Sequence, residues 1–424
     1  MRTNYLRFWP VLVLFVGVYA GCTSKPDSKI PDEKEMHFPS SIALSKDGRT
    51  VFVASHDSDG RYDLGRLVTL NASAIKQVID GTGEKKPLPW MSVIETNNLI
   101  PADISQIHLT DNFALFASRQ NNHLVALPVS LGKPSCNRPF EEASSCPQAT
   151  SYALSEVDPF ALAGLKSQGL QDTAVVSYLS SDRIDVFSIE PGSIKTIKSL
   201  WAQSWLSAKL SKKDLAKRRV ITKKIVVSFK NDASRSKTYF LLETHPQKTT
   251  GIAKAKALYV IAISTEALLA QESITESMIE IWDLQAQFAI ASANDFYVDE
   301  INNHAYLLAR APEALFKIDL GKKELLDTAI VCQGATSFTL DATENMMVVP
   351  CFSDNRLASY SLKPLRHLTT SPFIGRGPTA CVIDAIHRLV YCTFSLEGVV
   401  RVFDYTFGDL GYVFQKAPPY RVGS

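Results

Sequence analysis

The sequence predicts an all-β fold in which one four-stranded unit repeats around a ring, and three observations support this prediction. Short alternating or apolar runs separated by Gly, Asn, Asp and Ser dominate the chain, whereas helical periodicity is scarce. Two late segments align with a period of 43 residues, because Gly334 and Asp341 recur as Gly377 and Asp384. The 424 residues are 46% hydrophobic and 21% charged, which suffices for a buried core. Periods of about 40–45 residues with several strands each are typical of β-propeller blades.

Seven such units follow one another along the chain. They cover residues 39–95, 99–155, 159–200, 222–284, 290–331, 334–370 and 377–415. First hairpins turn at residues 46–49, 111–112 and 302–303. Third strands are expected to begin at Leu67, Leu124, Ile184, Leu315, Leu357 and Val399. We therefore expect seven four-stranded blades, with six or eight as alternatives, closed by a strand near 412–415 or by a segment near 30–38.

Three short runs carry a resemblance to known repeat families. The run VYCTF at 390–394 and the run VFVAS at 51–55 stand where one family has a Tyr-Val-Thr-Asn-like run, and Trp282-Asp283 is a lone WD dipeptide. With the period and the strand order, they make the chain after residue 38 similar to YVTN-type and WD-repeat β-propellers. The resemblance implies one propeller domain over residues 39–424.

The N-terminus is typical of an exported lipoprotein. Residues 1–21 combine two arginines, a short apolar stretch and a small-residue cleavage site before Cys22. The run VYAGC at 18–22 resembles the lipobox, with Tyr19 where an aliphatic residue is usual. This resemblance implies acyl chains such as palmitate on Cys22 and, because Thr23 follows, the outer membrane of a Gram-negative bacterium, facing periplasm or cell surface. Residues 22–38 are polar and are expected to act as a flexible tether. The alternatives are an ordinary secreted protein or a membrane anchor.

Charge excludes one class of partner. The chain has 45 Lys and Arg against 43 Asp and Glu, and the surplus cations, Arg2 and Arg7, lie in the signal segment. A mature protein without net charge is not a nucleic-acid binder. The local exception is a basic insert with a helix expected from Ser211 to about Arg219. Its eight cations are Lys209, Lys212, Lys213, Lys217, Arg218, Arg219, Lys223 and Lys224. An anionic polymer, anionic lipid or an acidic envelope protein would suit this insert, and a solvated inter-blade helix is the alternative.

Six cysteines follow Cys22, and an exported protein favours disulfides between them. Cys136 and Cys146 flank one loop. Cys381 and Cys392 lie opposite each other in one predicted hairpin, in which Asp384 pairs with Leu389. Cys332 and Cys351 bracket the preceding hairpin less symmetrically. Free buried thiols remain the alternative for the last two pairs.

A binding face is expected at the mouth of the central channel. In propellers of this type, the turns between second and third strands share one face with the connections between blades. The candidates on that face are His56, Arg61, Arg119, Asn121, His123, Arg310, Asp354, Arg356, Arg376 and Glu397. The set is biased towards positive charge, so we expect an anionic ligand. The alternative is a set of turn residues without a shared ligand.

Signals for cofactors and catalysis are sparse. Asp57, Asp59 and Asp63 stand in one Gly-containing loop and are a weak calcium candidate, whereas a solvated hairpin turn, in which Asp and Gly are common, is the favoured alternative. No other cofactor is predicted. The sequence contains no G-x-S-x-G, H-E-x-x-H, Walker A or dinucleotide-binding motif, so no catalytic residue is assigned.

Function is therefore predicted only by class. The first hypothesis is an envelope-anchored, non-catalytic platform that binds a protein, a polymer or a small ligand. The second is a propeller enzyme, since related propellers act as lactonases, hydrolases or quinoprotein dehydrogenases with a site in the central channel. His108 and His304, which lie on hairpin strands, are either part of such a site or packed in the core. The third is a purely structural envelope protein.

Overall fold

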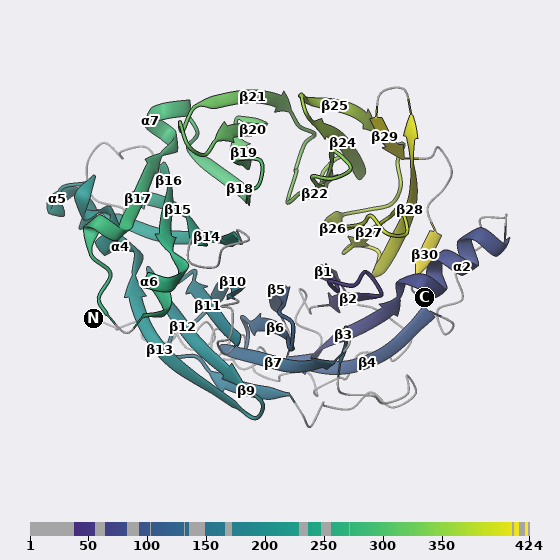
Figure 1. Ribbon diagram of the computed structural model, residues 1–424, viewed down its shortest axis with the longest axis horizontal. Coiled ribbons are helices and arrows are strands. Elements are labelled where there is room, and N and C mark those ends of the chain that lie inside the picture. The colour runs from purple at the N-terminus through teal and green to yellow at the C-terminus, as the bar shows by residue number, and fades with distance from the viewer. Residues whose placement is uncertain are drawn as a thin grey trace, which may run out of the picture.

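The protein is a seven-bladed β-propeller, as predicted. The computed structural model describes residues 38–55, 64–82, 93–101, 103–130, 132–134, 149–165, 172–228, 236–246, 256–270, 272–408, 411–414 and 420–422. Within them, seven antiparallel sheets stand around a central axis (Figure 1). Each sheet runs in chain order from an innermost to an outermost strand, so each blade is an up-and-down meander.

The first three blades occupy the N-terminal half. Blade 1 contains β1 (Pro39–Leu44), β2 (Thr50–Ser55), β3 (Leu64–Asn71) and β4 (Ile94–Pro101). Blade 2 contains β5 (Ile104–Leu109), β6 (Phe113–Ser118), β7 (His123–Ser130), β8 (Lys133–Pro134) and β9 (Thr150–Ala153). Blade 3 contains β10 (Pro159–Leu165), β11 (Asp172–Tyr178), β12 (Arg183–Glu190) and β13 (Ser193–Trp201).

The other four blades follow in order. Blade 4 contains β14 (Arg218–Ser228), β15 (Lys237–Pro246), β16 (Ala257–Ser264) and β17 (Ile279–Asp283). Blade 5 contains β18 (Ser292–Asp299), β19 (His304–Ala311), β20 (Glu313–Asp319) and β21 (Leu325–Ile330). Blade 6 contains β22 (Thr339–Asp341), β23 (Met346–Cys351), β24 (Arg356–Leu362) and β25 (Leu365–Thr370). Blade 7 contains β26 (Pro378–Asp384), β27 (Leu389–Phe394), β28 (Val399–Gly408), β29 (Gly411–Phe414) and β30 (Tyr420–Val422).

Short helices connect some of these strands. They are α2 (Ala72–Thr82), α4 (Ala202–Trp205), η1 (Leu206–Ala208), α5 (Lys212–Leu215), α6 (Thr265–Leu269), η3 (Glu276–Met278) and α7 (Leu284–Phe288). Among the described residues, none of these helices has both the length and the apolar character that a membrane span requires.

The second strands form the core between blades. In β2 every residue is buried, because one side of the strand faces blade 7 and the other faces blade 2. Val51 packs in one cluster with Tyr391 of blade 7, whereas Phe52 packs with Phe116 of blade 2. This alternation with a period of two explains the continuous apolar run in the sequence.

The ring closes by packing of blade 1 on blade 7. The expected C-terminal strand near 412–415 is confirmed as β29, which pairs with the far end of β28. β30 pairs with the near end of β28, between Val400↔Val422 and Val402↔Tyr420, so two short strands share the outer position. The alternative closing segment near 30–38 lies, apart from Phe38, outside the described residues.

One expected helix is wrong in its extent. α5 ends at Leu215 instead of about Arg219, although Ser211 caps it as predicted, since the Asp214 N–H donates to Ser211 Oγ at 3.1 Å. Arg218 already belongs to β14, and this strand starts before the expected boundary at 222 because Val220 and Ile221 are buried in the sheet. The basic insert is therefore part helix and part innermost strand.

Candidate binding face

Two faces of the ring differ in the loops that form them. Turns between second and third strands, and the connections between blades, lie on the same side because every blade is an antiparallel meander. We call this side the mouth face. Turns between first and second strands and between third and fourth strands lie on the opposite face.

Eight of the ten predicted binding residues lie in described mouth-face segments, and three of them, Asn121, Asp354 and Glu397, lie in turns between second and third strands. Arg119 and His123 belong to the β6–β7 turn, Arg310 lies near the end of β19, Arg356 starts β24, and Arg376 precedes β26. The other two, together with the calcium candidates, lie outside the described residues; they are His56, Arg61, Asp57, Asp59 and Asp63. Among the residues that the structure describes, no three His, Cys, Asp or Glu side chains gather as a metal site.

Arg119 and His123 are engaged within the fold. Arg119 Nε donates to Asp158 Oδ1 at 2.6 Å, and the hydrogen bond to this carboxylate raises the pKa of Arg119. The Asp158 N–H in turn donates to Asn122 Oδ1 at 2.8 Å. His123 Nδ1 lies 2.6 Å from the Asn121 carbonyl oxygen. These contacts tie blade 2 to the start of blade 3, so they hold the two side chains in place.

The remaining three arginines are free for a ligand. Arg310, Arg356 and Arg376 are exposed, and none of their guanidinium groups has a hydrogen-bond or ion-pair partner within the described parts of the chain. Two large apolar side chains lie in connections on the same face. Phe373, between β25 and β26, is 63% exposed, and Leu396, between β27 and β28, is 47% exposed. Exposed apolar groups beside unpaired cations are typical of interaction surfaces.

Backbone contacts bring four of these residues onto one surface. The Ile374 N–H donates to the Asn355 carbonyl oxygen at 3.4 Å, which sets Phe373 beside the turn that carries Arg356. The Arg376 N–H donates to Glu397 Oε1 at 2.8 Å, next to Leu396. We call the set Arg356, Phe373, Arg376 and Leu396 the blade 6–7 patch.

A close approach of the backbone supports this patch. Gly377 has φ +68°, and a Cβ atom there would come within 2.7 Å of Leu396 Cγ. A glycine is therefore required where the connection between blades 6 and 7 passes beneath Leu396.

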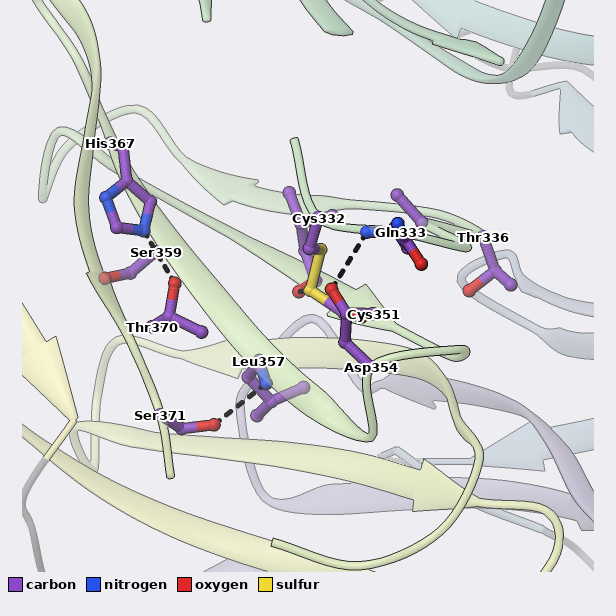
Figure 2. Close-up of a disulfide and its surroundings, with 12 residues drawn as sticks. Cys332, Gln333, Thr336, Cys351, Asp354, Leu357, Ser359, His367, Thr370 and Ser371 are labelled. Carbon is purple, nitrogen blue, oxygen red and sulfur yellow. Dashed lines mark hydrogen bonds between the residues drawn. A yellow bond between two sulfur atoms is a disulfide. The ribbon is translucent and has the colours of Figure 1, made fainter. Parts of the chain in front are cut away.

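Disulfides stiffen the same region. Cys332–Cys351 joins the connection between blades 5 and 6 to the end of β23, with the two Cα atoms 5.7 Å apart (Figure 2). Beside it, the Gln333 N–H donates to Asp354 Oδ2 at 3.0 Å, and the Leu357 N–H donates to Ser371 Oγ at 2.9 Å (Figure 2).

The second described disulfide lies within blade 7. Cys381–Cys392 joins opposite positions of β26 and β27, and the predicted pairing of Asp384 with Leu389 is confirmed. The structure thus contains both late disulfides that the sequence suggested. Cys136 and Cys146, like Cys22, lie outside the described residues.

A hollow of about 630 Å³ opens on the mouth face between blades 3 and 4. Its lining consists of Val157, Asp158, Leu179, Ser180, Arg219, Ile221, His245 and Pro246. Arg219 donates to the Leu179 carbonyl oxygen. His245 Nε2 lies 3.0 Å from Glu243 Oε1, but burial lowers the pKa of His245 despite this carboxylate. A neutral imidazole leaves Arg219 as the cation of the hollow.

The innermost strands carry an ion pair. Lys224 Nζ of β14 lies 3.0 Å from Asp295 Oδ1 of β18, and Asp295 Oδ2 accepts the Phe338 N–H at 3.1 Å. Burial, reinforced by the Lys224 charge, lowers the pKa of His108 on β5 to about 4. His304 starts β19, the second strand of blade 5, whereas His108 lies on the innermost strand of blade 2. The two histidines considered for a channel site are therefore not brought together.

Comparison with known proteins supports the fold and leaves function open. Neither a protein-family model nor a curated protein matches the sequence. The chain is similar to a solved structure of hydrazine synthase from Kuenenia stuttgartiensis, with a TM-score of 0.57 and 9% identity over 91% of this chain and 98% of that one. It is also similar to the Cps50 (Swd1) β-propeller domain from Myceliophteria thermophila, with a TM-score of 0.54 and 10% identity over 87% and 97% of the two chains. At such low identity these likenesses concern architecture alone, and they show that the chain is structurally similar to WD40-like β-propellers.

Proposed function

We propose that the protein is an envelope lipoprotein whose propeller binds an acidic protein partner through its mouth face. The blade 6–7 patch is the observation that carries this proposal. Two arginines whose guanidinium groups have no partner among the described residues flank two exposed apolar side chains there, and the Cys332–Cys351 disulfide joins the nearby connection between blades 5 and 6 to β23. Arginine and aromatic side chains such as phenylalanine are enriched at protein interfaces.

The patch favours a protein over an anionic polysaccharide. Carboxylates accept two parallel hydrogen bonds from a guanidinium group, so acidic side chains suit Arg356 and Arg376. Phe373 and Leu396 gain free energy only if apolar groups cover them, and a polysaccharide offers few. An acidic segment that also carries apolar side chains satisfies both requirements.

The basic insert adds long-range attraction on the same face. Both its ends, after β13 and before β14, lie on the mouth side of the ring. Its exposed lysines are Lys209, Lys212, Lys213 and Lys217. Surface cations of this kind raise the association rate of an acidic partner and make it sensitive to salt.

The test compares charge reversals on the two sides of the protein. Full-length protein in detergent is used to recover partners from its own envelope, with wild type beside Arg356→Glu/Arg376→Glu. We expect a stoichiometric acidic protein that the double variant loses by tenfold or more, and that rising salt releases. The matched control is Lys195→Glu/Lys322→Glu, which alters two exposed lysines away from the patch. Equal recovery by all three proteins contradicts the proposal.

A further inference from the structure

Ring closure brings a serine, a histidine and an aspartate into line on the opposite face. His387 Nδ1 lies 2.7 Å from Asp384 Oδ2, and His387 Nε2 lies 3.3 Å from Ser73 Oγ. Ser73 belongs to α2 of blade 1, whereas the other two residues flank the β26–β27 turn of blade 7. The sequence separates Ser73 from His387 by 314 positions, so only the closed ring forms this arrangement.

We propose that Ser73, His387 and Asp384 form a nucleophilic triad that hydrolyses short-chain carboxylic esters. The order of contacts is that of a serine nucleophile, its general base and the carboxylate that orients the base. This site lies on the other face from the blade 6–7 patch, so it stands or falls independently of the proposed binding function.

The carboxylate is placed to fix the histidine tautomer. Asp384 is 0% exposed, and its second oxygen, Oδ1, accepts a hydrogen bond from the backbone N–H of His387 at 3.1 Å. A proton on Nδ1 therefore points at Asp384, which leaves the Nε2 lone pair facing the Ser73 hydroxyl. The His387 side chain remains 17% exposed, so the base borders solvent. A separation of 3.3 Å is within the looser range of nucleophile–base pairs before substrate binds.

Ser73 also lies where a negative charge is stabilised. It is the second residue of α2, an eleven-residue helix, and the first N–H groups of a helix attract anions. The Ala72 N–H donates to the Arg49 carbonyl oxygen at 2.9 Å, and the Ala74 N–H donates to Asn71 Oδ1 at 2.8 Å. Between them, the Ser73 N–H has no partner among the described residues, so it is available to an oxyanion.

The reaction balances with water as the only co-reactant. Ser73 Oγ bonds to the ester carbonyl carbon while its proton passes to His387 Nε2, and Asp384 stabilises the imidazolium. The carbon–oxygen bond to the alcohol then breaks, and the alcohol leaves with the proton from His387. Water attacks the acyl group on Ser73, gives a proton to His387, and releases the carboxylic acid as Ser73 recovers its proton.

The surroundings favour a small substrate. Ile386 precedes His387 and is 68% exposed, and it packs against the β1–β2 turn at Gly48, where a Cβ atom would meet Ile386 Cδ1 at 2.6 Å. This side chain offers an apolar contact on an open surface. A short acyl group suits such a contact, so p-nitrophenyl acetate is the appropriate probe.

Covalent labelling tests the proposal directly. The full chain in detergent is treated with a fluorophosphonate, which bonds to an activated serine with loss of fluoride, and the modified residue is mapped by peptide mass spectrometry. We expect the label on Ser73, no label in Ser73→Ala, and at least a hundredfold slower labelling in His387→Gln. The matched control is Ser204→Ala, which removes another surface serine, one that donates to the Trp201 carbonyl oxygen. Hydrolysis of p-nitrophenyl acetate should follow the same order.

Two results would overturn it. One is folded wild-type protein, verified by its thermal transition, that carries no label on Ser73. The other is ester hydrolysis that persists at the wild-type rate in Ser73→Ala. Because the site of labelling is mapped in the wild type, the outcome does not depend on whether His387→Gln folds.

Discussion

Packing on an innermost strand changes the pKa of His108. Its ring lies against Gly164 of β10, where a Cβ atom would come within 2.6 Å of His108 Cδ2. Burial, and then the charge of Lys224, lowers the pKa of His108 to about 4, whereas in the unfolded chain it is about 6.5. The unfolded state therefore binds the proton more readily, so His108 contributes stability above about pH 6.5 and this contribution is lost as the pH falls towards 4.

Replacing His108 tests this linkage. We expect wild type to lose about 1–2 kcal/mol of unfolding free energy through this residue between pH 7 and pH 4.5, a value discounted because part of the residue stays accessible to solvent. His108→Gln should remove that part of the pH dependence in denaturant unfolding at the two pH values. His367→Gln, on an exposed ring of β25, is the control and should keep the wild-type slope. Identical slopes in all three proteins would show that His108 does not carry the linkage.

A second residue-scale prediction concerns Gly164. Its φ is not in the left-handed region, so alanine is disfavoured there by contact alone, with His108 and with Thr110 Cγ2 at 2.8 Å. We expect Gly164→Ala to lower the free energy of unfolding by about 1–3 kcal/mol, as overpacking does. Adding Gly164→Ala to His108→Ala should cost less unfolding free energy than adding it to wild type, because the contact with the imidazole ring is then absent. A Gly164→Ala variant as stable as wild type in urea unfolding would show that the two strands separate easily.

At the scale of elements, the alternation of the strands was predictable, whereas the helices were predictable only in part. The seven units and their hairpin turns follow from apolar runs and turn residues, which report burial locally. Helix α2 was not predicted, although Asn71 caps it and Ile75 and Ile79 form its buried side. One buried pair at i, i+4 after a strand is too short a signal beside the β pattern. α5 was overextended because its basic residues suit a helix and an exposed strand start alike.

The disulfide of blade 7 yields the prediction for this scale. Cys381–Cys392 closes a loop over a sequence separation of 11, for which chain entropy gives about 3 kcal/mol. We expect Cys381→Ala/Cys392→Ala to lower the free energy of unfolding by about 2–3 kcal/mol, measured in urea under non-reducing conditions. When wild type, Cys381→Ala/Cys392→Ala and Cys332→Ala/Cys351→Ala are all fully reduced before the measurement, the three proteins should become nearly equal in stability. An unchanged unfolding midpoint in the first variant would show that β26 and β27 pair as firmly without the bond.

At the scale of the whole molecule, the candidate sites depend on contacts that no local pattern reports. The sequence predicts Arg119 and Arg376 in one set, but Arg119 is bound by Asp158, 39 residues away, whereas the Arg376 guanidinium has no partner among the described residues. No sequence pattern points to Ser73, because its partner is on the last blade. A period predicts which loops share a face, whereas the state of each side chain depends on its neighbours across the ring. The sequence therefore predicts which loops share a face, but not which of their side chains lack a partner among the described residues.

The position of the propeller relative to a membrane gives the last prediction. The run ending in Cys22 and the polar residues 22–38 precede β1, so an acyl anchor on Cys22 would hold the folded ring without taking part in its packing. We expect radioactive palmitate to label wild type and not Cys22→Ala, and the variant to leave the membrane fraction. The two proteins should share one thermal transition, because among the described residues the ring is closed by packing of blade 1 on blade 7. Equal labelling of both proteins would remove Cys22 as the anchor, and a lower transition in Cys22→Ala would mean that the lipidated end supports the ring.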